Sequence, residues 1–196
     1  ELGISQVLAE AGFSEEQVQL AATQIVSRAV YPASELKTAS WLKENSAIGE
    51  LTGYDCEKIT KDRLYESALR LYAVKDRLEQ HLSHKTNELF DISDKIVLYD
   101  LTNTYFEGQY SSSQLAKYGR SKEKRNDASQ LVLALLVNIY GFIKYSAIHE
   151  GNMTDCENLS LMIDKLSRCT NAQNPVVVMD AGIATAENLE MIRAKG

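Results

Sequence analysis

The sequence predicts an α/β protein (α+β overall) in which a helical first region is followed by a mixed β-sheet flanked by helices. Two patterns predict this order. Apolar residues recur at helical spacing through residues 1–90, and short apolar runs alternate with helical patterns after residue 92. We therefore expect two domains, a helical region (1–91) and a sheet-containing region (92–196). A chain of 196 residues is long enough to bury a core, whether it forms one large domain or two small ones.

The helical region predicts three main helices. Ser14-Glu-Glu-Gln17 has the form of a capping box, so a helix begins there and ends at Tyr31-Pro32. A second helix begins at Ser34, and a long amphipathic helix follows over about 60–89. This last stretch is suited either to packing within its own domain or to pairing with a second copy. Three tyrosines are expected to pack rather than to stack on bases: Tyr54, Tyr65 and Tyr72.

The sheet-containing region predicts the order strand, strand–strand hairpin, helix, strand, helix. The expected elements are a strand over 95–102, a hairpin of 131–139 and 142–148, a helix opened by the capping box Thr154-Asp-Cys-Glu157, a strand over 176–179, and a helix capped by Thr185. The hairpin turn is Tyr140-Gly141. A two-residue turn joins antiparallel neighbours, so a purely parallel, doubly wound sheet is not expected.

Two aspartates each close an apolar run that predicts a buried strand. The runs are Lys95-Ile-Val-Leu-Tyr-Asp100 and Pro175-Val-Val-Val-Met-Asp180. Ligands of α/β sheets bind where strands end, and carboxylates on neighbouring strands are suited to hard divalent cations such as Mg²⁺ or Mn²⁺. We therefore expect a metal-dependent phosphoryl-transfer site at Asp100 and Asp180. The alternative for each aspartate is an Asx turn, in which the carboxylate only accepts a nearby backbone N–H.

Four blocks of the sheet-containing region carry a resemblance to a known family. They are Leu98–Glu107, Gly119–Gln130, His149–Asp155 and Val177–Gly182. In this order they resemble blocks of bacterial insertion-sequence transposases of the DDE (Asp-Asp-Glu) class. The order of elements also matches the front part of a ribonuclease H-like fold. Residues 1–91 resemble, more weakly, the helical region that precedes the catalytic core in such transposases, where it binds DNA ends or dimerises.

The resemblance implies a function for the parent protein: metal-dependent DNA strand cleavage and strand transfer in DNA transposition. It makes Asp100 and Asp180 the first two catalytic carboxylates and ligands of a two-metal Mg²⁺ or Mn²⁺ site. The third, a glutamate, is expected beyond Gly196. The implied partners are transposon-end and target DNA and further copies of the chain in a homo-oligomer. The implied location is the cytoplasm, and the nucleoid when DNA is bound.

The two ends of the sequence are those expected of a fragment. The chain begins at Glu1 without a methionine and stops directly after a helical pattern, so we expect a fragment of a longer protein. Without the third ligand this fragment is expected not to cleave or join DNA. No apolar stretch approaches the roughly 20 residues that a membrane span needs, so no membrane partner is expected.

Three other acidic residues lie close in sequence to the aspartate pair. Glu187 and Glu190 follow Asp180 on an expected helix, where we expect them to be solvated. Glu107 lies within a family-like block, which leaves open a role beside the site. None of the three is expected to be the third ligand.

Charge is distributed unevenly along the chain. The net charge of −6 does not indicate nucleic-acid binding, but the segment 117–125 holds five basic residues against Glu123. The five are Lys117, Arg120, Lys122, Lys124 and Arg125. We expect Lys117, Lys122 and Arg125 to contact DNA phosphates, in which case binding is salt-dependent and independent of base sequence. The alternative is a solvated loop.

Two other functions remain open at this stage. One is a non-catalytic module of a truncated element that binds DNA or dimerises through its helical region. The other is a phosphatase, because Asp100-Leu-Thr faintly resembles the aspartyl-nucleophile motif of haloacid dehalogenase-like phosphatases. That motif needs a second aspartate where Thr102 stands, and the predicted hairpin does not suit its doubly wound sheet.

Overall fold

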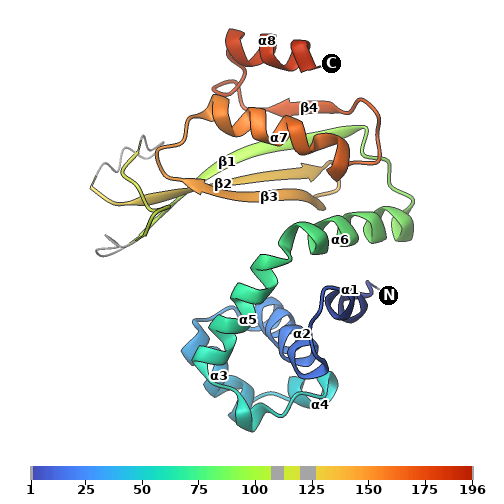
Figure 1. Cartoon of the computed structure of the whole chain (residues 1–196), viewed down its shortest axis with the longest axis vertical. Coiled ribbons are helices and arrows are strands. Elements are labelled where there is room, and N and C mark those ends of the chain that lie inside the picture. The colour runs from blue at the N-terminus through green and yellow to red at the C-terminus, as the bar shows by residue number, and fades with distance from the viewer. Residues whose placement is uncertain (1, 107–112, 120–126, 196) are drawn as a thin grey trace. The chain divides into compact units, whose positions relative to one another are not determined.

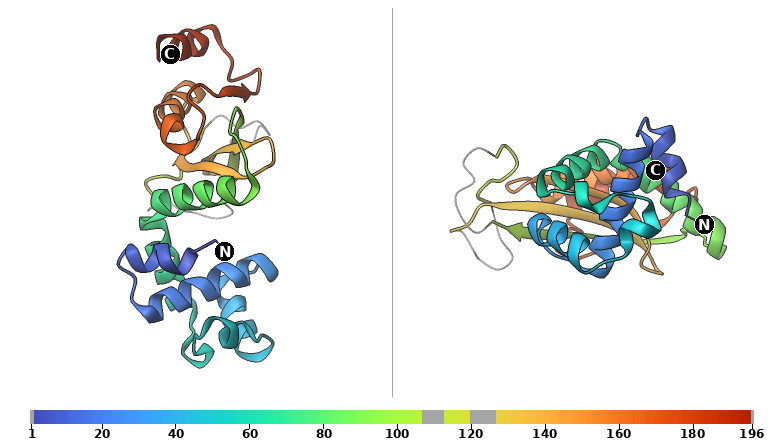
Figure 2. Two further views of the ribbon diagram at one scale, coloured as in Figure 1. Left: turned by 90° about the vertical axis from the view of Figure 1, so that its right-hand side faces the viewer. Right: turned by 90° about the horizontal axis from the view of Figure 1, so that it is seen from below.

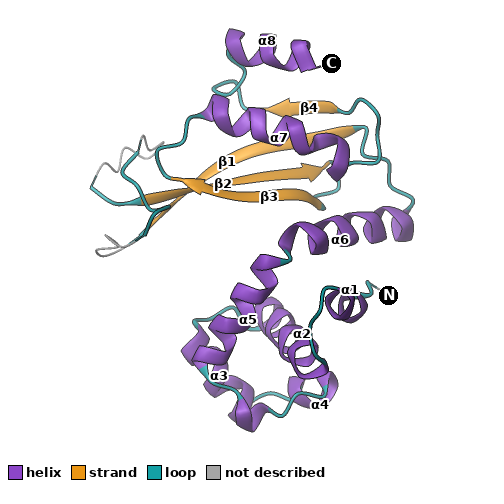
Figure 3. Ribbon diagram, in the orientation of Figure 1, coloured by secondary structure: helices purple, strands orange, loops and turns teal. Residues whose placement is uncertain are grey.

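The chain forms two compact units, Glu1–Leu82 and Ser83–Gly196 (Figure 1). The computed structural model describes residues 2–106, 113–119 and 127–195. The boundary between the two units falls within helix α6 (Lys75–Phe90). The domain boundary predicted near residue 92, from the change of periodicity, coincides instead with the end of that helix. The described residues contain eight α-helices and a four-stranded mixed sheet, which confirms the predicted α/β class (Figure 3).

The first unit is built from helices. They are α1 (Ile4–Glu10), α2 (Glu15–Val30), α3 (Glu35–Glu44), α4 (Ile48–Thr52), a 3₁₀ turn η1 (Cys56–Lys58), α5 (Lys61–Ala73) and the beginning of α6. The predicted capping box opens α2: the Ser14 hydroxyl accepts the Gln17 N–H, and the Gln17 side-chain oxygen accepts the Ser14 N–H at 2.9 Å. None of the described helices is long and apolar enough to cross a membrane.

The single long helix predicted over 60–89 is wrong, because the structure divides it at Val74. The Val74 N–H bonds to the Leu71 carbonyl at 3.2 Å, a tighter pattern that ends α5 before α6 begins. A β-branched side chain at this position also lowers helix propensity. The apolar residues keep their helical spacing across Val74, so this spacing alone does not reveal the boundary between α5 and α6.

The core of the first unit draws residues from most of its helices. Its buried members are Leu20, Ala39, Leu42, Ile48, Tyr54, Ile59 and Leu64. Tyr54 packs as expected, but Tyr65 and Tyr72 are 50% and 54% exposed. The reason is helical geometry: α5 buries Leu64, so the neighbouring face, which carries Tyr65 and Tyr72, points outward.

The second unit is a mixed sheet. Its strands are β1 (Ile96–Tyr105), β2 (Gln130–Asn138), β3 (Ile143–Glu150) and β4 (Val176–Met179), in the spatial order β3-β2-β1-β4. β2 is antiparallel to β1 and β3, whereas β4 is parallel to β1. The predicted hairpin is present, but the two-residue turn Tyr140-Gly141 is wrong: residues 139–142 join the strands, and the Gly141 N–H donates to the Asn138 carbonyl at 2.9 Å. Gly141 has φ +85°, a conformation that favours glycine. α7 (Asp155–Cys169) precedes β4 and α8 (Ala186–Lys195) follows it.

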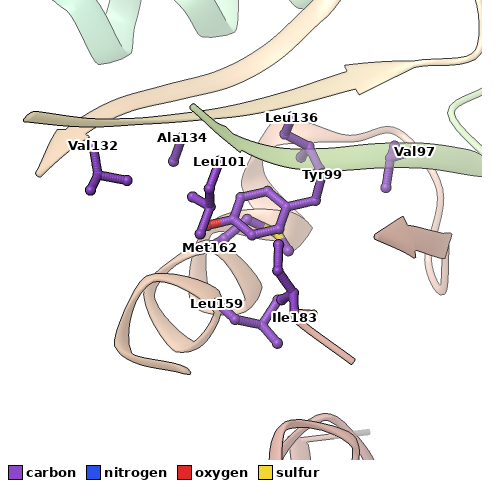
Figure 4. Close-up of a cluster of buried hydrophobic side chains, with 9 residues drawn as sticks. All are labelled: Val97, Tyr99, Leu101, Val132, Ala134, Leu136, Leu159, Met162 and Ile183. Atoms are coloured by element: carbon purple, nitrogen blue, oxygen red, sulfur yellow. The ribbon is translucent and has the colours of Figure 1, made fainter. Parts of the chain in front are cut away.

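The two faces of the sheet have different surroundings. Successive strand residues point to opposite faces. On one face the sheet packs against α7 (Figures 1, 2 and 4). This core contains Val97, Tyr99, Leu101, Val132, Ala134, Leu136, Leu159, Met162 and Ile183. The other face, which we call the open face, carries exposed apolar residues of the neighbouring strands β1 and β4: Ile96, Leu98, Val176 and Val178.

A buried ion pair lies at the beginning of the sheet. Lys144 Nζ is 3.0 Å from Asp94 Oδ1, and neither side chain is exposed. Amides and a hydroxyl surround the pair: Lys144 donates to Asn87 Oδ1 at 2.6 Å and to the Ser83 hydroxyl at 3.2 Å. Asp94 accepts from Asn87 Nδ2 at 2.8 Å and from Asn138 Nδ2 at 3.3 Å. The pair therefore joins α6, the link into β1, and the hairpin.

We predict that Lys144→Met destabilises the second unit strongly, because it leaves Asp94 buried without a counter-charge. Loss of one partner of a buried pair costs about 3–5 kcal/mol. Native-state hydrogen exchange of the β1–β3 amides measures this loss. Lys95→Met, which alters an exposed lysine, is the control. Equal protection of the sheet in both variants would show that the pair does not hold it.

Candidate metal centre

The sheet brings the two predicted carboxylates together. β1 and β4 are parallel, and their register runs from Ile96–Val176 to Tyr99–Met179. Asp100 and Asp180 directly follow the last pair of this register, and Asp180 lies just beyond the end of β4. Neighbouring strands lie about 4.8 Å apart, and residues in register point to the same face. Both aspartates are exposed. Asp100 lies on the open face of β1, because strand residues alternate and Tyr99 packs on the α7 side.

The expectation that Asp100 closes its strand is wrong. β1 continues to Tyr105, because β2 pairs with it from Val97–Asn138 through Tyr105–Gln130. Asp100 therefore lies in mid-strand, opposite Leu135 of β2. β4 alone ends at this level, at Met179, so the predicted edge is formed where the shorter strand stops beside the longer one.

Asp180 is held in place by a turn. The Gly182 N–H donates to Asp180 Oδ1 at 2.7 Å, and the Ile183 N–H donates to the Asp180 carbonyl at 2.9 Å. Ile183 is buried in the core, and Asn188 Nδ2 donates to its carbonyl at 2.5 Å. The Asx turn considered as an alternative is therefore present. It engages one carboxylate oxygen, so it is compatible with ligation through the other, Oδ2.

Asp100 is held differently. Its backbone belongs to the β1–β2 ladder, so it makes no Asx turn. The Thr102 hydroxyl lies 3.5 Å from Asp100 Oδ2, at the outer limit of a hydrogen bond. Thr102 is the next residue on the same face of β1, since strand side chains alternate. Among the described residues, the Asp100 carboxylate therefore has a longer hydrogen-bond contact, at 3.5 Å, than the 2.7 Å bond that Asp180 accepts.

The residues around the pair offer an incomplete ligand set. Within the part of the chain that the structure describes, no three His, Cys, Asp or Glu side chains are grouped as a metal site would need. Glu187 and Glu190 are exposed on α8, and Glu107 lies outside the described residues. Two carboxylates fit part of the oxygen shell of Mg²⁺ or Mn²⁺, which commonly keeps several waters.

The basic segment is described only at its beginning. The Lys117 N–H donates to the Gln130 carbonyl at 3.2 Å, and the Gln130 N–H donates to the Lys117 carbonyl at 2.9 Å. A Cβ added at Gly119 would lie 2.0 Å from the Gly151 carbonyl oxygen, so glycine is required for this close approach. Lys117 is therefore fixed where β2 begins. Lys122 and Arg125 lie outside the described residues.

Comparison with protein-family models, with curated proteins and with solved structures finds no match. The assignment of a function therefore depends on the aspartate pair and on the sequence blocks. The aspartates and, as an alternative, the Asx turn at Asp180 were expected from sequence, but the residues that support this turn were not. The Asp-x-Gly spacing was the available signal for Gly182, whereas no local pattern marks Ile183 or Asn188 as its supports.

His149 lies in one of the family-like blocks and gives the second unit a pH dependence. It is half-buried on β3 opposite Val132, a core residue, and burial lowers its pKa. As the pH falls below about 6.5, the unfolded chain takes up the proton before the folded chain does. The contribution of His149 to the stability of the second unit is therefore fully present above that pH, and it is lost progressively as the pH falls towards the lower pKa of the folded state.

We predict that His149→Gln removes this loss, because glutamine does not titrate. Hydrogen exchange of the sheet amides between pH 7.5 and about 5.5, corrected for intrinsic exchange rates, measures it. His84→Gln changes an exposed histidine and should leave the dependence as it is. An unchanged pH dependence in His149→Gln would contradict the prediction.

Proposed function

We propose that this chain carries two carboxylates of the metal centre of a DDE transposase, which cleaves and transfers DNA strands in transposition. The observation that carries the proposal is that Asp100 and Asp180 directly follow Tyr99 and Met179, the last pair of the parallel β1–β4 register, and that both are exposed. The strand order β3-β2-β1-β4, with only β4 parallel to β1, supports it, since it is the order of the front part of a ribonuclease H-like sheet. The four sequence blocks support it independently.

The two aspartates would share the work of holding Mg²⁺ or Mn²⁺. Bound metal supplies activation of the attacking oxygen and stabilisation of the leaving oxygen in phosphoryl transfer. Asp180, with Oδ1 engaged by the Gly182 N–H, offers Oδ2 as a single ligand atom. Asp100, whose carboxylate has the longer hydrogen-bond contact among the described residues, is suited to contact more than one cation.

DNA is the proposed partner, contacted by Lys117 and by the basic residues that follow it. Phosphate contacts of this kind position DNA and make binding depend on salt. We further propose that the active form is a homo-oligomer, and that the protein works in the cytoplasm and on the nucleoid. These proposals rest on the resemblance together with the local positive charge of residues 117–125.

A second candidate is a non-catalytic module that dimerises or binds DNA through the helical unit. The exposed face of α5 favours it, because Tyr65, Leu69 and Tyr72 lie at spacing i, i+4, i+7 and are each at least half exposed. The phosphatase alternative has less support. Its doubly wound sheet is parallel, whereas β1 pairs antiparallel with β2, and Thr102 stands where that motif needs an aspartate.

We predict that the chain binds Mn²⁺ weakly and that Asp100→Asn and Asp180→Asn each reduce the affinity at least about tenfold, because a neutral amide is a poorer ligand for a hard cation. Electron paramagnetic resonance of free Mn²⁺ measures the binding. Glu190→Gln, an exposed acid on α8, is the control.

A companion variant tests how Asp180 is held. A Cβ at residue 182 would lie 3.0 Å from Asp180 Oδ1, so Gly182→Ala should displace the carboxylate and weaken Mn²⁺ binding, though less than Asp180→Asn does. Ala181→Ser is its control. Mn²⁺ affinity that is equal in wild type and in both aspartate variants would remove the metal centre from the proposal.

We also predict that Lys117→Gln weakens binding to duplex DNA equally for all base sequences. The loss of one phosphate contact should reduce the slope of log affinity against log salt by about 0.9. Fluorescence anisotropy with two unrelated duplexes at several salt concentrations measures both effects. Lys95→Gln removes an exposed lysine that precedes β1 and is the matched control. The same change of slope in both variants would indicate charge loss without a specific contact.

A further inference from the structure

Three backbone N–H groups of the turn after β4 hold Asp180. One of them, from Gly182, donates to the carboxylate oxygen Oδ1 at 2.7 Å. The other two, from Ile183 and Ala184, donate to the Asp180 carbonyl at 2.9 and 3.2 Å. The position of the carboxylate therefore depends on how the peptide units over 181–184 are oriented.

The peptide unit between Ile183 and Ala184 is held from outside this turn. The Ile183 carbonyl accepts the Thr185 N–H at 2.9 Å and the side-chain amide of Asn188, Nδ2, at 2.5 Å. A carbonyl oxygen has two lone pairs, so these two donors complete its hydrogen bonding. Because a peptide unit is planar, fixing this carbonyl also fixes the Ala184 N–H at its other end. The side chain of Asn188, on α8, thereby orients a group that donates to Asp180.

Asn188 is itself fixed and buried. It is 1% exposed, and its backbone N–H donates at 3.3 Å to the hydroxyl of Thr185, the residue expected to cap α8. Its side-chain oxygen, Oδ1, is buried without a hydrogen-bond partner among the residues described. A buried polar atom without a partner is costly, and leucine would fill nearly the same space without that cost. The amide at this position is therefore explained by the bond that its N–H group makes, and not by packing.

We propose that Asn188 is a positioning residue for Asp180. Its amide fixes the 183–184 peptide, this peptide helps to fix the Asp180 backbone, and the Gly182 N–H then orients Oδ1 and leaves Oδ2 for a divalent cation. The inference rests on the proposed function in one respect, that the Asp180 carboxylate is a metal ligand. It makes α8 a support of the metal centre that acts behind the ligand, as the hydrogen-bonding partners of metal ligands commonly do.

The test compares Asn188→Leu with Asn158→Leu in the full chain. Leucine has nearly the shape of asparagine but lacks the amide donor. Asn158 is the matched control: it is also 1% exposed and its Oδ1 also lacks a partner among the described residues, but its Nδ2 donates to the Thr154 carbonyl, at the start of α7.

We expect Asn188→Leu to accelerate hydrogen exchange of the Gly182 amide and to weaken Mn²⁺ binding, each by about tenfold, because the turn is less firmly held. Asn158→Leu should leave both quantities as they are. Hydrogen exchange of the β1 and β2 amides shows whether the sheet is intact in each variant. Asn188→Ala removes the same donor without adding apolar bulk and should give the same two changes, so it decides the result if leucine disturbs the sheet.

The exchange of Gly182 is measured without metal, which separates this inference from the proposed function. Faster Gly182 exchange together with weaker Mn²⁺ binding supports both. Faster exchange in a chain whose Mn²⁺ binding does not depend on Asp180 supports the positioning of Asp180 and removes the metal centre. Wild-type Gly182 exchange in both Asn188 variants, equal changes in Asn158→Leu, or Asp180-dependent Mn²⁺ binding that Asn188→Leu leaves unchanged would overturn the inference.

Discussion

The sheet-containing unit depends on one buried ion pair, Asp94 with Lys144. Removing both charges from water is expensive, and attraction between them offsets this only with good geometry and further hydrogen bonds. Here amides from α6 and β2 supply those bonds. Asp94 lies directly before β1, and Lys144 lies on β3. The pair therefore fixes where β1 enters the sheet, and with it the register that places Asp100.

Two carboxylates 80 positions apart in sequence (180 − 100) become neighbours through that register. The fold treats them unequally. Asp180 follows a short strand and is held by a turn that is anchored in the core, whereas Asp100 lies within a long strand and, among the residues described, has the longer side-chain hydrogen bond. This difference suits a pair in which one ligand has a fixed role and the other adjusts to what is bound.

Local signals in the sequence predicted local structure well. Ser14 and Thr154 begin their helices through the predicted capping boxes, and Gly141 lies in the connection of the predicted hairpin. Features that depend on distant partners were not predictable. β1 extends past its apolar run because β2 pairs with it from Val97 through Tyr105. Asp94 pairs with Lys144 although nothing in the sequence near either residue marks them as partners. The same holds for the candidate site. The ends of the apolar runs indicated the two aspartates, but the support of Asp180 by Ile183 and Asn188 could be seen only in the folded structure.

The open face of the sheet has a consequence for the two carboxylates. Asp100 continues the row of the exposed Leu98 side chain on β1, and Asp180 follows directly after β4, two residues from the exposed Val178. A partner that packs against these exposed apolar residues would also exclude water from around the two acids and lower the local dielectric constant. Interactions between charges strengthen several-fold on such a change. Binding of such a partner would therefore both bury the apolar residues and strengthen the interactions of the two carboxylates with any charge beside them.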